Sequence, residues 1–436
     1  MADSRPWWMA AEMPLHDFDD HDLDDPLLRN DFPMTQRILI RATGVARPGQ
    51  LAGLGQALAR SGARLLDINQ SVTFGLVSLE ALVALGAESE LEAALAAAGE
   101  QLGLDVQAVQ IGAEEYLRWS HQAERPRWIL TLLAPRLPAG ILAEVGGLTA
   151  EFGITVELMH RLSGREPLDG ESPAEGACVE CWLRLPEGEI NIAALREKAL
   201  ALGALHGVDI AIQEDDIWRR HRRLICFDMD STLIQTEVID ELARRHGVGE
   251  EVSAVTERAM RGELDFKESF RERMSKLKGL DEAVLADIAA NLPLMDGVER
   301  LMANLKVLGY RTAILSGGFT YFARHLQELL GFDEIHANEL VIENGKVTGE
   351  VREPIVDAER KALLLREIAA RHGLRMEQTI AVGDGANDLK MLAEAGLGIA
   401  FRAKPLVREQ ARQSISTLGL DAVLYLMGYH HQDLEH

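Results

Sequence analysis

The sequence predicts an α/β protein in which two ferredoxin-like βαββαβ modules precede a Rossmann-like, doubly wound parallel sheet with a helical cap. The first reason is that the order strand, helix, strand, strand, helix, strand occurs in residues 37–111 and again in 128–213, which is typical of ferredoxin-like units. The second is that three apolar runs, at 224–227, 312–315 and 379–382, each end in glycine or short polar residues. Such runs are typical of parallel strands whose carboxyl ends form a ligand site.

The first module is assigned to residues 34–115. It follows residues 1–33, which carry nine acidic residues, two basic residues and four prolines. This composition predicts a flexible acidic tail, because little of it can form a core. In the module, the period of the apolar residues separates strands from helices. The expected strands are 37–43, 65–73, 76–85 and 105–111, and the expected helices are 51–61 and 90–102.

The second module is assigned to residues 125–215 and repeats the same order with weaker similarity. Cys178 and Cys181 have Cys-x-x-Cys spacing, but no second Cys or His pair accompanies them at the spacing of a zinc site. We therefore interpret both cysteines as strand residues. The expected strands are 128–133, 155–162, 177–185 and 209–213, and the expected helices are 141–152 and 192–202.

The C-terminal region, residues 221–429, is expected to alternate strands and helices as a doubly wound sheet requires. Residues 252–291 show helical periodicity and no strand signal, which predicts a helical cap spanning about 242–293. The basic run at 219–223 is interpreted as a solvated lead-in to this region. Residues 430–436 are expected to be a frayed tail, in which Leu434-Glu435-His436 resembles a vector remnant.

Charge and hydropathy exclude several classes of function. A formal net charge of −24 without a basic stripe argues against a nucleic-acid partner. No basic segment followed by an apolar core begins the chain, and glutamates interrupt the Ala-rich stretch at 80–104, so neither a signal peptide nor a membrane span is expected. Three cysteines are too few for a disulfide framework. A cytoplasmic protein is expected.

Polar segments follow the three predicted strands of the C-terminal region. The first strand is followed by Asp228-Met229-Asp230-Ser231-Thr232, the second by Ser316-Gly317-Gly318, and the third by Gly383-Asp384-Gly385-Ala386-Asn387-Asp388. Lys361 lies between the last two, in a helix expected to begin near Asp357. One carboxylate can attack a phosphorus atom while its neighbour moves a proton. A hydroxyl followed by glycine amides can cradle phosphate oxygens.

In this order the four segments resemble the motifs of the haloacid dehalogenase superfamily. Glu237, the Leu264-Asp265-Phe266 stretch, Arg273 and Phe319 extend the resemblance to its phosphoserine phosphatase family, over residues 222–426. The upstream modules resemble the tandem ACT-type regulatory modules of the longer bacterial members. The resemblance implies an enzyme that hydrolyses O-phospho-L-serine to L-serine and phosphate, the last step of serine biosynthesis.

The resemblance also implies roles for the carboxylates. Asp228 would be the nucleophile that forms an aspartyl-phosphate, and Asp230 the general acid and then the general base. A Mg²⁺ ion would be held by Asp228, Asp384 and the backbone carbonyl of Asp230. Asp388 would orient the groups around the metal rather than bind it directly.

Phosphate binding is implied for Ser316, the Gly317 amide, Lys361 and Asn387. A positive charge fixed beside the phosphate oxygens is the role expected of the lysine. The alternative for Lys361 is an exposed helix lysine, because lysine side chains are usually solvated.

The amino-acid part of the substrate is implied to contact Glu237, Phe266 and Arg273. Glu237 would pair with its ammonium, Arg273 would grip its carboxylate, and Phe266 would pack over it as the cap closes. Two alternatives stay open at this point. Glu237 could serve only a helix dipole, and Arg273 could form a surface ion pair.

Other classes of function are weighed against this one. P-type ion pumps share the aspartyl-phosphate chemistry, but they carry Lys where this chain has Asp230, and they need transmembrane helices. A phosphatase or phosphotransferase for another small metabolite stays open, as does an amino-acid sensor with secondary phosphatase activity. The ACT resemblance implies an amino-acid effector, with Gly44-Val45-Ala46-Arg47-Pro48-Gly49 as its loop, and a homodimer by analogy. The loop at 135–140 departs from that pattern, so scaffold and sensor are both retained.

Overall fold

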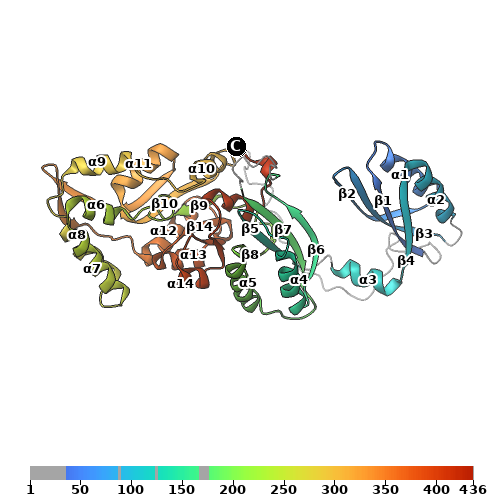
Figure 1. Cartoon of the computed structure of the whole chain (residues 1–436), viewed down its shortest axis with the longest axis horizontal. Coiled ribbons are helices and arrows are strands. Elements are labelled where there is room, and N and C mark those ends of the chain that lie inside the picture. The colour runs from blue at the N-terminus through green and yellow to red at the C-terminus, as the bar shows by residue number, and fades with distance from the viewer. Residues whose placement is uncertain (1–35, 87–89, 123–125, 166–175, 436) are drawn as a thin grey trace, which may run out of the picture. The chain divides into compact units, whose positions relative to one another are not determined.

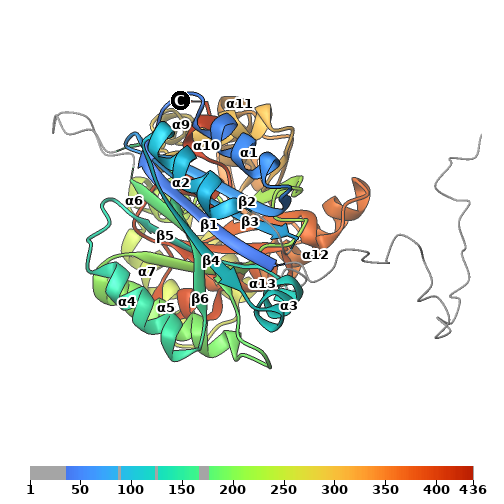
Figure 2. The same ribbon diagram turned by 90° about the vertical axis from the view of Figure 1, so that its right-hand side faces the viewer.

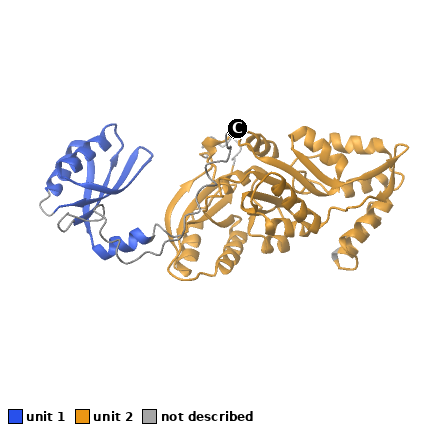
Figure 3. Ribbon diagram, turned by 180° about the vertical axis from the view of Figure 1, so that it is seen from behind, with its two compact units in different colours: residues 1–125 blue, residues 126–436 orange. Residues whose placement is uncertain are grey.

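The computed structural model of the chain describes residues 36–86, 90–122, 126–165 and 176–435. It divides into two compact units, residues 1–125 and 126–436 (Figures 1 and 3). The predicted acidic tail, residues 1–33, lies outside the described residues. Among the helices of the described ranges, none combines the length and apolar character that crossing a membrane requires.

The first unit is a ferredoxin-like module, as predicted. Its antiparallel sheet has the order β2-β3-β1-β4, and α1 and α2 lie across one face of it (Figure 2). Ile40, Leu54, Val83 and Leu95 fill the core between the sheet and these helices. The elements are β1 (Gln36–Val45), α1 (Gln50–Arg60), β2 (Arg64–Thr73), β3 (Leu76–Leu85), α2 (Leu91–Leu102) and β4 (Leu104–Ile111). A helix that the sequence did not predict, α3 (Ala113–Gln122), follows.

The second module repeats this topology, with the sheet order β6-β7-β5-β8. Both cysteines of the Cys-x-x-Cys spacing lie in β7 and are buried and free. They belong to different clusters of buried residues, Cys178 to one shared with the C-terminal region and Cys181 to the module's own, which confirms the strand interpretation. The elements are β5 (Trp128–Ala134), α4 (Ile141–Glu151), β6 (Thr155–Arg161), β7 (Ala177–Arg184), α5 (Ile192–His206) and β8 (Asp209–Glu214).

The C-terminal region contains a parallel sheet with the strand order β11-β10-β9-β14-β15-β16. The first strand of this sheet in chain order, β9, therefore lies in its middle. The strand order reverses there, which is where doubly wound folds bind ligands. The strands are β9 (Leu224–Phe227), β10 (Arg311–Phe319), β11 (Glu334–Asn338), β14 (Thr379–Gly383), β15 (Leu397–Phe401) and β16 (Gln413–Ile415). A hairpin that the sequence did not predict is formed by β12 (Leu340–Glu343) and β13 (Lys346–Val351).

Helices cover both faces of this sheet. Phe227 and Val382 point into one apolar core, and Cys226 and Ala381 point into the other, because successive strand residues face opposite sides. The second core is closed by Leu365 and Ile368 of α12. The helices are α10 (Val298–Val307), α11 (Thr320–Leu330), α12 (Ala358–Arg371), α13 (Leu389–Glu394), α14 (Pro405–Gln410) and α15 (Val423–Leu426).

The segment between β9 and β10 is helical, as predicted for a cap. The Asp265 carboxylate accepts a hydrogen bond from Glu268 N, and Glu268 accepts one from Asp265 N, which forms a capping box at the start of α8. Asp281 caps α9 in a similar way. The four helices are α6 (Val238–His246), α7 (Gly249–Met260), α8 (Phe266–Lys276) and α9 (Glu282–Ala290).

The second module is joined to the edge of the parallel sheet by side chains that bond to backbone groups. Gln413 of β16 donates from Nε2 to the Ile212 carbonyl at 2.7 Å, and its Oε1 accepts from Ile212 N at 3.0 Å. The Asp209 carboxylate accepts from the backbone nitrogens of Ser416 and Thr417 at 2.7 and 2.8 Å. These groups are buried or half-buried, so β8 covers the outer side of β16.

Two predictions about charged or terminal segments are wrong. The run at 219–223 is not simply solvated, because Arg219 and Arg222 are buried and Arg219 forms an ion pair with the buried Glu180 of β7. The tail at 430–435 is not frayed, because Leu434 is buried. Glu435 N donates to Asn304 Oδ1 at 2.8 Å, which further anchors the tail. In both cases the partner lies far away in the sequence.

Candidate active site

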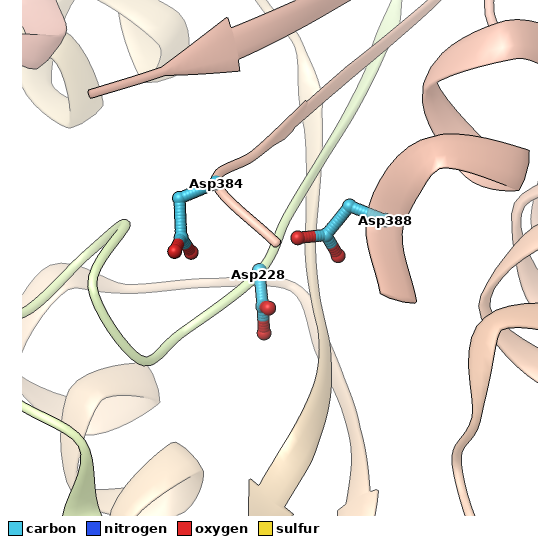
Figure 4. A group of neighbouring side chains, drawn as sticks. All are labelled: Asp228, Asp384 and Asp388. Atoms are coloured by element: carbon cyan, nitrogen blue, oxygen red, sulfur yellow. The ribbon is translucent and has the colours of Figure 1, made fainter. Parts of the chain in front are cut away.

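The polar segments predicted from the sequence converge at the carboxyl edge of β9, β10 and β14. Asp228 follows β9 directly, and Asp384 follows β14, its neighbour in the sheet. Asp388 closes the short 3-10 helix η4 (Ala386–Asp388) after that strand. Figure 4 shows the three carboxyl groups gathered around one point, which each approaches from its own segment of chain.

Lys361 forms the floor of this site. Its Nζ lies 2.7 Å from Asp228 Oδ2 and 2.7 Å from Asp388 Oδ1, and its side chain is 0% exposed. Burial alone would lower the pKa of Lys361, but the charges of Asp228 and Asp388 outweigh it and hold the pKa above its ordinary value. The alternative of an exposed helix lysine is therefore wrong.

The remaining oxygens of these two carboxylates are also held. Asp228 Oδ1 accepts from Met229 N at 2.7 Å, and Asp388 Oδ2 accepts from Gly385 N at 2.9 Å. Both oxygens of Asp388 thus accept hydrogen bonds, one from Lys361 and one from the Gly385 amide. Such contacts are typical of a group that orients its neighbours.

Asp228, Asp384 and Asp388 offer oxygen atoms that all lie within 4.8 Å of one another. Burial, followed by the charges of Asp228 and Asp388, raises the pKa of Asp384 to about 8. Its Oδ1 accepts from the buried Thr232 hydroxyl at 3.2 Å. Crowded carboxylates with one lysine between them fit a hard divalent cation, which would relieve their mutual repulsion.

Asp230 lies at the mouth of the site. Its Oδ1 accepts from Val238 N at 3.1 Å, and a Cβ on Gly318 would come within 2.6 Å of its Oδ2, so glycine is needed there. Burial raises the pKa of Asp230 well above its ordinary value, with further contributions from Glu237 and Asp228. A carboxyl group that stays protonated at higher pH can serve as a general acid.

The turn after β10 is fixed by side-chain hydrogen bonds. Ser316 is fully buried, and its Oγ accepts from Gly318 N at 2.9 Å. The Gly317 carbonyl accepts from Asn338 Nδ2 at 2.8 Å. The Ser316 hydroxyl hydrogen is not used in this bond, because the serine oxygen is its acceptor.

A cavity of ≈ 470 Å³ opens above these groups, between the cap and the sheet edge. It is lined by the predicted residues Asp228, Asp230, Glu237, Phe266, Arg273, Gly317, Asp384 and Asn387. Ser316, Lys361 and Asp388 lie beneath its surface, since all three are fully buried. The structure therefore brings every predicted site residue into or directly under one cavity.

The two residues whose roles were left open both face this cavity. Glu237 precedes α6 but makes no capping hydrogen bond, and its Oε1 accepts from the Ser231 hydroxyl at 2.9 Å. Within the part of the chain that the structure describes, the buried Nε of Arg273 has no hydrogen-bond partner. Burial lowers the pKa of Arg273, against the opposing charges of Asp240, Glu237 and Asp230. These observations disfavour a surface ion pair for Arg273, whereas Glu237 lies at the start of α6, where a carboxylate also suits the helix dipole.

Aromatic residues join the cap to the sheet edge. The rings of Phe266 and Phe270 are stacked with centroids 6.2 Å apart, and Phe270 lies 5.9 Å from Phe319 of β10. Phe266 reaches the turn after β10, because a Cβ on Gly317 would lie 3.2 Å from its ring. The cap residue predicted to cover the substrate thus lies directly over the turn.

Sequence reasoning missed several residues that hold or line the site. Thr232 donates to Asp384, Asn338 donates to the Gly317 carbonyl, and Lys404 lines the cavity from the segment after β15. Thr232 stands in the first motif and could have been found by its spacing from Asp228. Asn338 ends β11 and Lys404 follows β15, so nearness to a strand end was the signal that could have found them.

Comparisons with known proteins agree with this geometry. A family model described as haloacid dehalogenase-like hydrolase matches residues 222–396, and one described as an ACT domain matches residues 36–109. The chain is 40% identical over 406 residues to the phosphoserine phosphatase of Streptomyces coelicolor, covering 91% of this chain and 93% of that relative. It is 38% identical over 407 residues to that of Mycobacterium tuberculosis, covering 92% and 96%.

Similar solved structures belong to the same group of hydrolases. A haloacid dehalogenase family hydrolase from Salmonella enterica serovar Typhi has a TM-score of 0.59 at 31% identity, covering 69% of this chain and 99% of that one. A probable phosphoserine phosphatase from Vibrio cholerae has a TM-score of 0.55 at 37% identity, covering 70% and 86%. With relatives aligned over nine-tenths of its length and the family's motifs gathered around one cavity, the chain belongs to the phosphoserine phosphatase family of haloacid dehalogenase-like hydrolases.

Proposed function

We propose that this chain hydrolyses O-phospho-L-serine to L-serine and phosphate through an aspartyl-phosphate on Asp228. One observation carries the proposal. The buried Lys361 ammonium lies 2.7 Å from the Asp228 carboxylate, on the floor of a cavity that also contains Arg273 and Glu237. The cavity thus offers a cation for a phosphate, an arginine for a carboxylate and a glutamate for an ammonium.

The reaction has two steps. An Asp228 oxygen attacks the phosphorus atom, the bond from phosphorus to the serine oxygen breaks, and Asp230 donates its proton to the leaving oxygen. Asp230 then accepts a proton from a water molecule, which attacks the phosphorus and releases phosphate from Asp228. Lys361, the Ser316 hydroxyl and the Gly317 amide hold the phosphate oxygens in both steps.

The residues present fit a Mg²⁺ ion. Asp228 and Asp384 would hold it through side-chain oxygens and Asp230 through its backbone carbonyl, while Asp388 orients the group through Lys361 and Gly385. A bound Mg²⁺ would neutralise charge on the phosphate and on the attacking carboxylate.

Substrate selection would depend on the residues of the cavity that face the amino-acid part of the substrate. Arg273 would bind the serine carboxylate in a bidentate fork, and Glu237 would pair with the ammonium. Phe266 would pack over the substrate, and Asn387 would contact the phosphate from the loop after β14.

The N-terminal part is assigned a regulatory role. An amino-acid effector would bind the ACT-like modules, and the chain would form a homodimer in the cytoplasm. The proposed domains are residues 1–33, 34–115, 125–215 and 221–429. The first ACT-like module coincides with the region that matches the ACT domain family.

Turnover of phosphoserine tests the activity. The rate of phosphate release should be compared for phosphoserine, phosphothreonine, phosphoethanolamine and sugar phosphates, with Mg²⁺ and with excess chelator, and with and without added serine. We expect the highest kcat/KM for phosphoserine, in the presence of Mg²⁺. Equal kcat/KM for all four substrates would contradict the assigned specificity.

A further inference from the structure

We infer that Asn338 is a positioning residue for phosphate binding, because its side chain holds the Ser316–Gly318 turn and the start of the Lys361 helix in one arrangement. Asn338 ends β11, a strand that carries none of the residues predicted from the sequence. It is 2% exposed. The inference rests on the proposed function and adds a residue to it.

Asn338 bonds to two segments through the two ends of its amide. Nδ2 donates to the Gly317 carbonyl at 2.8 Å, and Oδ1 accepts from Val356 N at 2.8 Å. The carbonyl needs a donor and the amide needs an acceptor, so only one orientation of the side chain satisfies both partners. A buried amide with both ends paired has little freedom to move.

The first of these bonds acts on the phosphate turn. The peptide between Gly317 and Gly318 is held at both ends, its carbonyl by Asn338 and its N–H by Ser316 Oγ, at 2.9 Å. Because the Ser316 oxygen accepts this hydrogen bond, its own hydrogen remains available to a phosphate oxygen. Rotation of this peptide would therefore change the donor that Ser316 presents.

The second bond acts on the lysine. Val356 directly precedes Asp357, whose carboxylate caps α12 by accepting from Arg360 N. Lys361 follows within the first turn, and its N–H donates to the Asp357 carbonyl at 2.9 Å. Asn338 thus connects the serine turn to the helix that carries Lys361, although neither segment is its neighbour in the sequence.

The experiment compares Asn338→Asp with Asn304→Asp. Asn304 is a matched control because it is also 2% exposed and bridges backbone groups. Its Nδ2 donates to the Arg300 and Glu435 carbonyls, and its Oδ1 accepts from Glu435 N. Both variants keep an acceptor and lose a donor, but only Asn338 touches the phosphate turn. Asn338→Ala is the second variant, and it introduces no buried charge.

The measurements are the inhibition constants of inorganic phosphate and L-serine, kcat/KM for phosphoserine, and urea unfolding. We expect both Asn338 variants to bind phosphate and turn over phosphoserine about 10- to 100-fold less well, as for misplacement of a binding group by about 1 Å. Binding of L-serine, which has no phosphate, should stay within about twofold of wild type, a difference of less than half a kcal/mol. Asn304→Asp should lose stability without a change in phosphate affinity.

A purely structural role would give a different pattern. If the Asn338 variants unfold more easily but bind phosphate as the wild type does, or weaken serine and phosphate equally, the inference is wrong. If the wild type does not hydrolyse phosphoserine at all, the proposed function fails instead. Phosphate affinity from calorimetry still tests Asn338 in that case, because it needs no turnover.

Discussion

Asp228 and Lys361 form a buried ion pair, with Oδ2 and Nζ 2.7 Å apart and side-chain exposures of 7% and 0%. The other oxygen of Asp228 accepts from Met229 N at 2.7 Å. The carboxylate proposed to attack the phosphorus atom is thus fixed in position before any substrate enters, which reduces the reorganisation needed for reaction.

Replacing Lys361 by Gln should reduce kcat by about 10²- to 10³-fold, the usual cost of removing one fixed donor to a developing charge. It should also destabilise the fold by about 3–5 kcal/mol, because Asp228 and Asp388 lose the cation that compensates them. Steady-state rates and urea unfolding would measure the two effects. Lys390→Gln is the control, because Lys390 pairs with Glu359 on the surface. Equal kcat in both variants would refute the role of Lys361.

Asp230→Asn should separate the two chemical steps. With phosphoserine, the variant should lose about 10²- to 10⁴-fold in kcat, because the leaving oxygen is no longer protonated. With p-nitrophenyl phosphate, whose leaving group needs no proton, a burst of nitrophenol should appear, because only hydrolysis of the aspartyl-phosphate is slow. Stopped-flow absorbance would show the burst. A variant with slow turnover and no burst would place Asp230 elsewhere in the reaction.

The pH dependence of the wild type follows from the same carboxyl group. The pKa of Asp230 is raised, so its protonated form persists to higher pH than in an ordinary aspartate. For phosphoserine, kcat should therefore fall as the pH rises through that pKa, and this fall should be absent in Asp230→Asn. Rates measured across a pH series for both proteins would check this. An identical alkaline fall in the variant would assign the titration to another group.

Mg²⁺ binding should become tighter as the pH rises. In the metal-free protein the pKa of Asp384 is about 8, so at neutral pH most of this carboxyl group is protonated and must lose its proton to hold a cation. Calorimetry in buffers of different ionisation enthalpy should show proton release at pH 6–7 and less at pH 9. Activity lost in chelator should return with added Mg²⁺. Full activity in excess chelator would contradict the metal's role.

Arg273→Ala should damage recognition more than chemistry. Loss of the paired carboxylate should lower kcat/KM for phosphoserine by about 30-fold or more, corresponding to at least about 2 kcal/mol. Phosphoethanolamine, which lacks the carboxylate, should be affected far less. Arg271→Ala is the control, because Arg271 lies in the same helix and pairs with Glu353 on the surface. Equal losses for the two substrates would argue against this contact.

Much of the fold was predictable because its signals are local. The strand expected at 224–227 has the observed bounds. The positions of the carboxylates that follow it depend only on where this one strand ends. The unpredicted hairpin also had a local signal, since Asn344-Gly345 between β12 and β13 is the pair that favours tight turns with positive φ.

Other features depend on partners that a linear pattern does not reveal. Arg219 is buried because it forms an ion pair with Glu180, which lies 39 residues earlier in the chain. Asn338 binds Gly317, 21 residues earlier, and Glu435 bonds to Asn304, 131 residues earlier. Burial of a polar side chain is decided by such distant partners, so the sequence alone assigned these segments to solvent or to no role.

The side-chain amide of Gln413 forms two hydrogen bonds with the backbone of Ile212, which a neighbouring strand would otherwise form. An enzyme shortened to begin at residue 221 would lack β8, so the outer edge of β16 would be exposed. Unpaired backbone groups on an exposed edge strand promote self-association. The practical starting point for an isolated phosphatase is therefore residue 126, because the second ACT-like module belongs to the same compact unit as the parallel sheet.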